Sequence, residues 1–287
     1  MEELVYLNGD LIPRSRARLS AFDHGFLYGY GLFETMRSYN GSIFLLDRHL
    51  ARLHGAADTL GLTPRLAPID LKEACCAVLK ANKLKDARLR LTVSAGEGDM
   101  VPNPATCAGI TVFIVAQKLL PPPLETCERG FKTILSTIRR NSQSPLSRLK
   151  SSCYLENVLA RQEARLAGAD EALILNEKGL LAEGSSCNIF LVKKQTLLTP
   201  SIESGVLPGI TREVILELAR TSGIEAVEKG IELDELLEAD EAFLTNSIIE
   251  IMPLTQLDDK PIGSGKPEIT RQLISAYGKL IPAHTAD

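Results

Sequence analysis

The sequence has no tryptophan, and aromatic residues make up only 5% of its 287 positions. Positive charge is not in excess either. The formal net charge is -4, so no global positive field would hold nucleic acid or anionic lipid. No apolar run reaches the roughly 20 residues that a membrane-spanning helix needs. We therefore expect a small-molecule substrate, with no nucleic-acid partner and no membrane partner.

The six cysteines and four histidines lack the spacing of a metal site. In particular, there is no Cys-x-x-Cys pair. The sequence begins Met1-Glu2-Glu3, without a charged and then apolar leader, so we expect a cytoplasmic protein whose cysteines stay reduced. No bound metal is predicted.

Common nucleotide and hydrolase motifs are also missing. There is no Gly-x-Ser-x-Gly nucleophile turn and no Walker lysine loop. The stretch Gly29-Tyr30-Gly31 lacks the third glycine of a dinucleotide-binding fingerprint. These absences argue against an α/β hydrolase and against a Rossmann domain.

What is present is an ordinary globular composition, with 45% hydrophobic and 24% charged residues. The length corresponds to about two domains of ~150 residues each. The proline run at 121–123 cannot continue a helix or a central strand, so we place an interdomain linker at 119–124. This division predicts an N-terminal α/β domain over 1–118 and a C-terminal α/β domain over 125–287.

Turn residues and apolar periodicity predict the elements of the first half. Asn8-Gly9 and Asn40-Gly41, each between apolar runs, predict hairpins because both turn residues need a positive φ. Asp47 is expected to cap a helix that Gly61 ends. The other expected elements are a helix at 69–81 and strands at 89–93 and 109–116.

The second half shows the same mixture of periodicities. One helix is expected at 154–166 and another at 211–221, which Gly223 ends. The first of these has apolar residues at helical spacing: Leu155, Val158, Leu159 and Leu166. Strands are expected near 131–138, 171–175, 186–192 and 242–245. The fold class predicted from these patterns is α/β, as an α+β protein of two domains.

Three features contain residues that could act in catalysis or bind a ligand. Lys150 stands just ahead of the helix at 154–166, in a segment otherwise poor in charge, and Glu183 lies at the mouth of an apolar strand. The segment 205–212 joins a glycine-containing loop to a helix start, whose amides can bind phosphate. Ordinary interpretations stay open at this point, because most lysines and edge carboxylates are solvated and Pro-Gly before a helix is commonly plain capping.

Together these residues resemble the class IV aminotransferases, the fold type IV pyridoxal-phosphate enzymes. This family includes branched-chain aminotransferase, D-amino acid aminotransferase and 4-amino-4-deoxychorismate lyase. The resemblance covers nearly the whole chain, from the Asn8-Gly9 hairpin through motifs at 22–29, 31–35, 49–53 and 245–253. It implies a fold like that of D-amino acid aminotransferase, with pyridoxal 5′-phosphate held between two domains. It also implies a homodimer whose partner lends loop residues to the site.

The resemblance implies a role for each candidate catalytic and cofactor-binding residue. Lys150 would form the internal aldimine and then shuttle the substrate proton, and Glu183 would face the pyridine nitrogen and keep the ring protonated. Tyr154 could approach the phenolic oxygen of the cofactor, although a core aromatic at a helix start is the commoner case. The remaining cofactor-binding residues implied by the family motifs are Arg52, Leu207, Gly209, Ile210, Thr211, Asn246 and Ser247. Of these, Arg52, the helix start at Ile210 and Thr211, and Ser247 would hold the phosphate, and Leu207 would pack on one ring face.

The candidate substrate residues are Phe33, Arg90 and Arg148. The two arginines could reach a substrate carboxylate, but exposed salt-bridge roles suit them equally.

Family motifs also bear on the reaction. The D-amino acid enzymes carry an Arg-x-His carboxylate trap, and the stretch 96–102 has neither residue. Bacterial branched-chain enzymes carry a Tyr-Ile-Arg-Pro strand, where this chain has Leu89-Arg90-Leu91-Thr92 and keeps at best the arginine. Motifs that look like those of the aminodeoxychorismate lyases of the folate pathway occur at 22–29, 44–47, 87–91, 94–96, 139–141 and 148–151.

We therefore expect a lyase that releases pyruvate and 4-aminobenzoate. The alternative is a transaminase, for branched-chain L-amino acids rather than D-amino acids. A catalytically silent protein that binds pyridoxal phosphate is a third possibility, against which the intact Lys150, Glu183 and Arg52 count.

Overall fold

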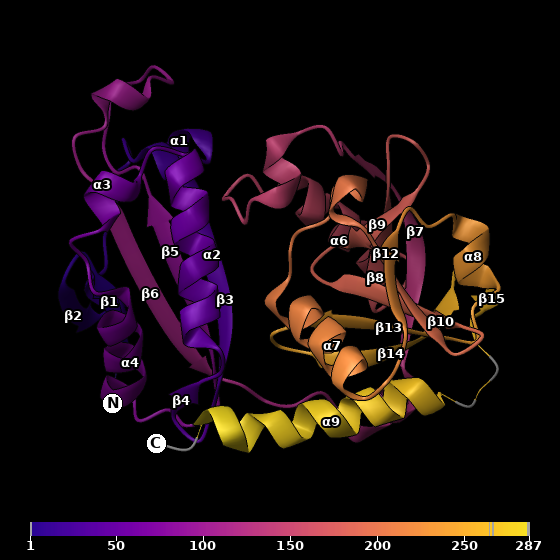
Figure 1. The fold of residues 1–287 in the computed structure, drawn as a ribbon. Coiled ribbons are helices and arrows are strands. Elements are labelled where there is room, and N and C mark those ends of the chain that lie inside the picture. Colours follow the sequence, from indigo (N-terminus) through magenta and orange to yellow (C-terminus); the bar gives the residue numbers. More distant parts are fainter. Residues whose placement is uncertain (1, 264, 266, 286–287) are drawn as a thin grey trace. The chain divides into compact units, whose positions relative to one another are not determined.

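A computed structural model of the chain describes residues 2–263, 265 and 267–285. The chain forms two compact units, drawn in Figure 1. Of the described residues, unit 1 holds 2–120, the short segment Leu149–Cys153 and 281–285, and unit 2 holds the others. The single linker predicted at 119–124 does not account for the two later segments that belong to unit 1. Their place in unit 1 depends on tertiary pairing rather than on local composition.

Unit 1 is built on a six-stranded sheet in the order β2-β1-β6-β5-β3-β4, in which every pair of neighbours is antiparallel. Its strands are β1 (Leu4–Leu7), β2 (Asp10–Pro13), β3 (Gly31–Tyr39), β4 (Ser42–Ile43), β5 (Ala87–Ser94) and β6 (Thr111–Lys118). Both predicted hairpins are confirmed. Asn8 and Gly9 have φ values of 50° and 109°, and Asn40 and Gly41 have 53° and 96°.

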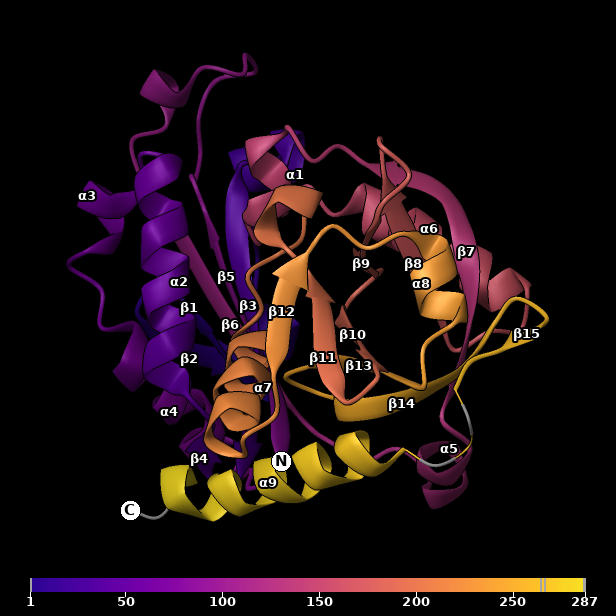
Figure 2. The same cartoon turned by 45° about the vertical axis from the view of Figure 1, so that its right-hand side comes forward.

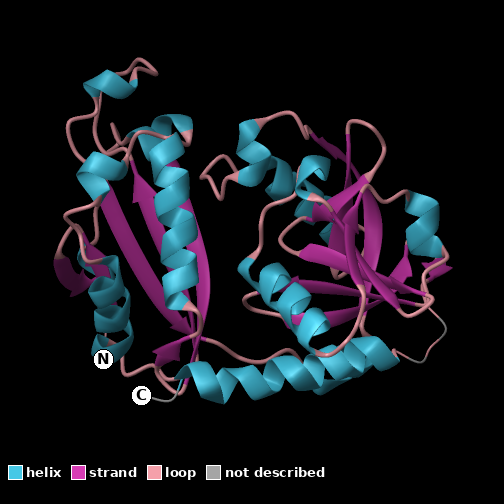
Figure 3. Cartoon of the chain, viewed as in Figure 1, coloured by secondary structure: helices cyan, strands magenta, loops and turns pink. Residues whose placement is uncertain are grey.

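Helices pack on this sheet, as Figure 3 shows in cyan against magenta. They are α1 (His24–Tyr28), α2 (Leu46–Thr59), α3 (Thr63–Leu66) and α4 (Leu71–Ala81), with 3-10 turns at Arg14–Arg16 and Pro104–Thr106. Helices α2 and α4 bury Leu53, Ala57, Cys75 and Val78 against the sheet. The helix prediction for 69–81 is confirmed, with Asp70 as its N-cap.

The predicted cap of α2 is wrong by two positions. The N-cap is Leu45, which has φ 53°, and Asp47 lies inside the first turn. An acidic residue there still complements the helix dipole. Gly61 follows the C-cap with φ 65°, so the predicted end of the helix is correct.

Unit 2 contains a nine-stranded mixed sheet in the order β12-β11-β10-β13-β14-β7-β8-β9, with β15 paired to β14. Figure 2 shows β11 and β12 side by side in the same direction, and β14, β7 and β8 form the other parallel pairs. The strands are β7 (Phe131–Arg140), β8 (Glu171–Asn176), β9 (Leu181–Gly184), β10 (Asn188–Lys193), β11 (Thr196–Pro200), β12 (Ala226–Lys229), β13 (Glu241–Asn246), β14 (Glu250–Leu257) and β15 (Lys260–Pro261).

The helices of unit 2 include the two that the sequence predicts, near 154–166 and 211–221. They are α5 (Leu124–Arg129), α6 (Leu155–Leu166), α7 (Ile210–Thr221), α8 (Leu233–Leu237) and α9 (Glu268–Thr285), with 3-10 turns at Pro145–Arg148 and Ile202–Ser204. The residues of α9 from Ile281 on are the ones that belong to unit 1. Helix α6 packs on β7 and β8 through Ala160 and Ala164, whereas its larger apolar residues are exposed.

All six cysteines have free thiols. Among the described residues, no helix combines the length and the apolar character needed to cross a membrane. Within the same residues, no group of three or more His, Cys, Asp or Glu side chains is arranged to hold a metal ion.

Candidate active site

Backbone pairing with the start of β3 fixes the position of Lys150 in unit 1. Phe33 N donates to Lys150 O at 2.9 Å, Ser152 N donates to Gly31 O at 2.8 Å, and Leu32 forms an antiparallel bridge with Ser151. The lysine therefore follows the register of a long, largely buried strand rather than the conformation of a free loop.

The aromatic ring of Phe33 lies next to two cationic groups. Lys150 Nζ is 4.6 Å from the ring centroid, and the guanidinium carbon of Arg90 is 3.7 Å from it. Cations are attracted to the face of an aromatic ring, so Phe33 holds both side chains in place. The structure thus brings together the three predicted residues Phe33, Arg90 and Lys150.

Arg52 is part of a buried cluster with Glu34 and His49. Its Nε donates to Glu34 Oε1 at 2.8 Å and its Nη2 to Glu34 Oε2 at 2.6 Å, while His49 Nδ1 lies 2.7 Å from Glu34 Oε2. Glu34 comes from β3, and His49 and Arg52 lie three residues apart on α2, one helical turn. Sequence reasoning named Arg52 but not its two partners.

The electrostatics of this cluster are set by burial and by the arginine. Burial alone would raise the pKa of Glu34, but the Arg52 charge and the hydrogen bonds from His49 and Arg52 outweigh it and lower the pKa to about 2. Burial also lowers the pKa of His49, against the pull of Glu34. The cluster is therefore a carboxylate, a guanidinium and a neutral imidazole, whose Nδ1 donates to the carboxylate.

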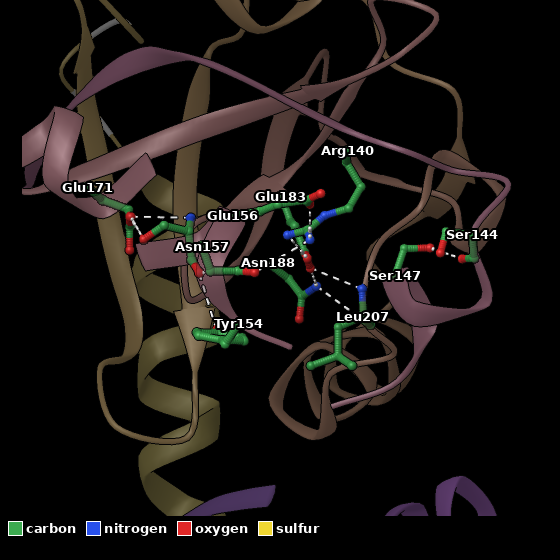
Figure 4. Close-up of polar contacts among 11 residues, drawn as sticks. Arg140, Ser144, Ser147, Tyr154, Glu156, Asn157, Glu171, Glu183, Asn188 and Leu207 are labelled. Atoms are coloured by element: carbon green, nitrogen blue, oxygen red, sulfur yellow. Dashed lines mark hydrogen bonds and ion pairs between the residues drawn. The ribbon is translucent and has the colours of Figure 1, made fainter. Parts of the chain in front are cut away.

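Glu183 on β9 is the central carboxylate of unit 2 (Figure 4). It is buried, and its contacts include Arg140 Nη2 at 3.2 Å, Leu207 N at 3.0 Å and Asn188 Nδ2 at 3.4 Å, each of which donates to the carboxylate. The backbone contact ties the carboxylate to the loop before α7. The predicted residues Glu183 and Leu207 therefore contact each other directly, whereas the roles of Arg140 and Asn188 were not predicted.

The N-terminus of α7 has no side-chain cap. Gly209 is the N-cap and has no side chain to cap the first amides, which belong to the buried residues Ile210 and Thr211. A Cβ at Gly209 would lie 2.0 Å from Asn188 Oδ1, so a larger residue would displace the Asn188 side chain. Asn188 also donates to Leu207 O at 3.0 Å and so fixes the turn.

Tyr154 is the N-cap of α6 and is half-buried. Its hydroxyl donates to Ser185 O at 3.2 Å, and Asn157 Nδ2 donates to the same carbonyl at 2.7 Å. Glu171, which is buried, accepts from the Ser185 amide and hydroxyl and so holds this loop. Burial, and next the charge of Glu183, raises the pKa of Tyr154, which keeps the phenol protonated.

Two predicted residues lie at the end of β13, where Asn246 is the last residue of the strand and Ser247 follows it. The Asn246 side chain donates to Ser186 O at 3.0 Å and accepts from the amides of Ile248 and Ile249. These bonds shape the turn that presents the half-buried Ser247.

Arg148 is exposed at the end of the 3-10 turn Pro145–Arg148. The pKa of Glu203 is lowered by hydrogen bonds within its own turn and from Ser201, and further by the nearby Arg148 charge. The predicted site residues of unit 1 are Phe33, Arg52, Arg90 and Lys150, and those of unit 2 are Arg148, Tyr154, Glu183, Leu207, Gly209, Ile210, Thr211, Asn246 and Ser247.

Comparison with known proteins gives a consistent family. A model of the class IV amino-transferases matches residues 31–257. A Methanocaldococcus jannaschii protein, provisionally named a branched-chain-amino-acid aminotransferase, is 39% identical over 271 residues, 94% of this chain and 93% of that protein. The aminodeoxychorismate lyase of Bacillus subtilis is 40% identical over 280 residues, 97% of this chain and 94% of the lyase.

Solved structures agree. The branched-chain amino acid aminotransferase of Escherichia coli superposes with a TM-score of 0.91 at 29% identity, over 100% of this chain and 97% of that one. A branched-chain amino acid aminotransferase from T.th., solved with pyridoxamine 5′-phosphate, has a TM-score of 0.90 at 28% identity, over 99% and 95% of the two chains.

The chain belongs to the class IV aminotransferase family. The predicted family, fold class and status as an enzyme are thereby confirmed, and pyridoxal phosphate is the cofactor of this class.

Proposed function

We propose that the protein is a pyridoxal-phosphate-dependent 4-amino-4-deoxychorismate lyase, which converts its substrate into pyruvate and 4-aminobenzoate. The observation that carries this choice is the 40% identity with the Bacillus subtilis lyase along 97% of the chain. The lyase-like motifs, and the absence of the carboxylate traps typical of the D-amino acid and branched-chain enzymes, support it further.

The residues of this chain fit the chemical parts of the cofactor. A phosphate dianion suits the uncapped first amides of α7 and the guanidinium of Arg52. A protonated pyridine nitrogen suits the buried carboxylate of Glu183. The protonated Tyr154 phenol can donate to a ring oxygen.

When bound, the cofactor supplies an aldehyde that condenses with amines and a ring that accepts electrons from the neighbouring carbon. We assign Lys150 Nζ as the amine that holds this aldehyde. Nζ would also be the base that takes the proton from the substrate. Phe33, to which both the Lys150 amine and the Arg90 guanidinium are close, would keep Nζ oriented for both roles.

In the lyase reaction the proton that Lys150 removes comes from the substrate ring, and the bond between the ring and the enolpyruvyl oxygen breaks. The leaving group takes up a proton as pyruvate, and the ring becomes aromatic as 4-aminobenzoate. No oxidant or second substrate is needed. Arg90, held over Phe33, is the residue we assign to a substrate carboxylate, because a guanidinium binds carboxylates through paired hydrogen bonds.

The second candidate is a transaminase of branched-chain amino acids. The 39% identity with the Methanocaldococcus jannaschii protein supports it. Arg90 is compatible with this reaction as well, since an α-carboxylate is bound by the same chemistry.

The absorption spectrum of the cofactor-loaded protein separates the candidates. D- and L-amino acids are added one at a time without any keto acid. We expect the visible band of the lysine-bound cofactor to persist, and aminodeoxychorismate to yield 4-aminobenzoate. Conversion to pyridoxamine phosphate by one amino acid would instead identify a transaminase and its substrate.

Two variants control this experiment. Lys150→Ala should lose the visible band and all turnover, whereas Lys178→Ala, which changes an exposed lysine in a turn, should retain both. A band that survives in Lys150→Ala would refute the assignment of the lysine. A loaded protein with a normal band but neither activity would be a silent family member.

We also propose that the protein is a homodimer in the cytoplasm. The free thiols of its cysteines suit a reducing compartment. Helix α6 supports a partner subunit, because it exposes an apolar row along one side: Leu155, Val158, Leu159 and Leu166.

A further inference from the structure

Glu34 is the most deeply buried charged group of unit 1. Its side chain is only 1% exposed, and the Arg52 side chain that it contacts is 14% exposed. Burying a carboxylate is costly unless charged and hydrogen-bonding partners compensate it. Here Arg52 donates to Glu34 through Nε and Nη2, and the neutral His49 donates to it through Nδ1.

The contacts orient the guanidinium in a specific way. Glu34 accepts from Nε and Nη2, which form one side edge of the planar group. A guanidinium has a second bidentate edge, between Nη1 and Nη2, and this end-on edge is not the one that Glu34 takes. A ligand that reaches the end-on edge therefore meets an arginine whose plane is already fixed.

We propose that Glu34 is a positioning residue, which fixes Arg52 so that its end-on edge binds the phosphate of the cofactor, with His49 holding Glu34 in turn. This inference rests on the proposed function, because it assigns the ligand of Arg52 to that cofactor.

Charge and geometry predict opposite effects for Glu34. As a negative charge near a dianion, Glu34 alone would weaken phosphate binding. As a holder of the arginine, it strengthens binding, because a long side chain with many rotamers no longer loses its freedom when the phosphate binds. The sign of the effect on affinity therefore distinguishes a positioning role from mere charge.

The test compares two ligands of the cofactor-free protein. Dissociation constants for pyridoxal 5′-phosphate and for pyridoxal, which lacks the phosphate, are measured by equilibrium titration of visible absorbance. The ratio of the pyridoxal constant to the pyridoxal 5′-phosphate constant reports the phosphate contribution alone. We expect Glu34→Gln to lower this ratio about 10- to 30-fold while leaving the affinity for pyridoxal unchanged. An unchanged or higher ratio would overturn the proposal.

A double-mutant cycle tests whether the effect passes through the arginine. Arg52→Met should lower the ratio strongly, and adding Glu34→Gln to it should change the ratio no further. A further loss in that background would show that Glu34 acts by another route, which contradicts the proposal.

Two more variants keep the test decisive if Glu34→Gln does not fold. Glu34→Asp keeps the charge but is too short to reach both nitrogens, so we expect a ratio lowered as in Glu34→Gln. His49→Gln keeps the ion pair and should lower the ratio less. Wild-type ratios in both variants would exclude the positioning role. If the wild-type protein bound neither ligand, both the proposed function and this inference would be refuted. If the wild-type protein bound pyridoxal 5′-phosphate more tightly than pyridoxal, but the Glu34 variants had the same ratio, only this inference would be refuted.

Discussion

The contact between Arg140 and Glu183 is a buried ion pair within unit 2. The side chains are 10% and 8% exposed, and Arg140 also lies 3.5 Å from Asn157 Oδ1 and 3.3 Å from Glu156. Its Nε is buried without a hydrogen-bond partner among the described residues. Arg140 is thus the counter-ion of Glu183, the carboxylate that we assign to the pyridine nitrogen.

Arg140→Met should destabilise the cofactor-free protein by about 3 kcal/mol, because it leaves a buried carboxylate without its counter-ion. Thermal and urea unfolding measure the loss. Arg139→Met, which changes the exposed neighbour, should cost well under 1 kcal/mol. Adding Glu183→Gln to Arg140→Met should recover part of the stability, and a double variant no more stable than Arg140→Met would contradict the ion-pair account.

Glu34 makes stability depend on pH in a direction that can be derived. Its pKa is about 2 in the folded protein and 4.5 in the reference state, so the unfolded chain binds more protons between these values. The stabilisation, about 3 kcal/mol by linkage, is complete above pH 4.5 and is lost as the pH falls toward 2. His49 acts in the same direction, since its lowered pKa makes the unfolded chain take up a proton below pH 6.5.

The corresponding variant is Glu34→Gln, whose unfolding free energy should fall less steeply than that of the wild type between pH 4.5 and 3. Chemical denaturation at several pH values measures the slope. Glu238→Gln is the control: the pKa of Glu238 is also lowered, chiefly by its hydrogen bond to Lys193, but the carboxyl is exposed and solvent screens it. Equal slopes in wild type and Glu34→Gln would show that the cluster does not control acid sensitivity.

At the residue scale, the sequence assigns a cofactor role to one member of each pair and not to the other. The family resemblance implies roles for Arg52 and Glu183, whereas their partners Glu34 and Arg140, 18 and 43 positions away, occur in the motifs at 31–35 and 139–141 without a role of their own. Such pairs are formed by strand register and helix packing, which no local pattern specifies. The spacing of His49 and Arg52 on one helix face is a usable signal that two side chains point the same way.

At the scale of elements, the start of α9 depends on a distant carboxylate. Glu241, at the beginning of β13, accepts from Ile269 N at 3.0 Å, from Thr270 N at 2.8 Å and from the Thr270 hydroxyl at 2.7 Å. It thereby satisfies amides in the first turn of the helix and places a negative charge at the positive end of its dipole.

Glu241→Ala should therefore cost about 1–2 kcal/mol of stability and loosen the first turn of α9. Hydrogen exchange at the amides of Ile269 and Thr270 detects the local loss, and urea unfolding gives the global one. Glu268→Ala provides the comparison, because this exposed acid is in the same turn. If both variants gave the same exchange rates, the cap would contribute nothing specific.

Elements set by a few neighbouring residues are predicted well, and faces of helices are predicted less well. The Asn-Gly hairpins are correct because two residues determine the turn. The periodicity of α6 is also correct, but its buried residues are Asn157, Ala160 and Ala164. Periodicity shows which side chains share a face; it does not show whether the sheet or something outside the subunit covers that face.

At the scale of the whole molecule, this exposed apolar side of α6 is a feature that a single chain leaves unexplained. Leu155 and Leu166 are 68% and 72% exposed, at the two ends of the helix. An open groove runs beside it, lined by Val158, Arg161, Gln162, Arg165 and Ala169. An isologous dimer would cover this side twice, since a two-fold axis places the same surface of each subunit against the other.

Leu155→Glu should therefore convert the proposed dimer into a monomer. Burying an unpaired carboxylate costs several kcal/mol, and two-fold symmetry imposes that cost at two places in one interface. Sedimentation equilibrium measures the mass, and the visible band of the cofactor reports whether the monomer still binds it. Leu124→Glu is the matched control for Leu155→Glu, because Leu124 on α5 is 74% exposed and lies outside α6. The Leu124→Glu protein should remain dimeric. A Leu155→Glu protein with the wild-type mass would place the dimer contact elsewhere, and a monomeric wild-type protein would refute the homodimer itself.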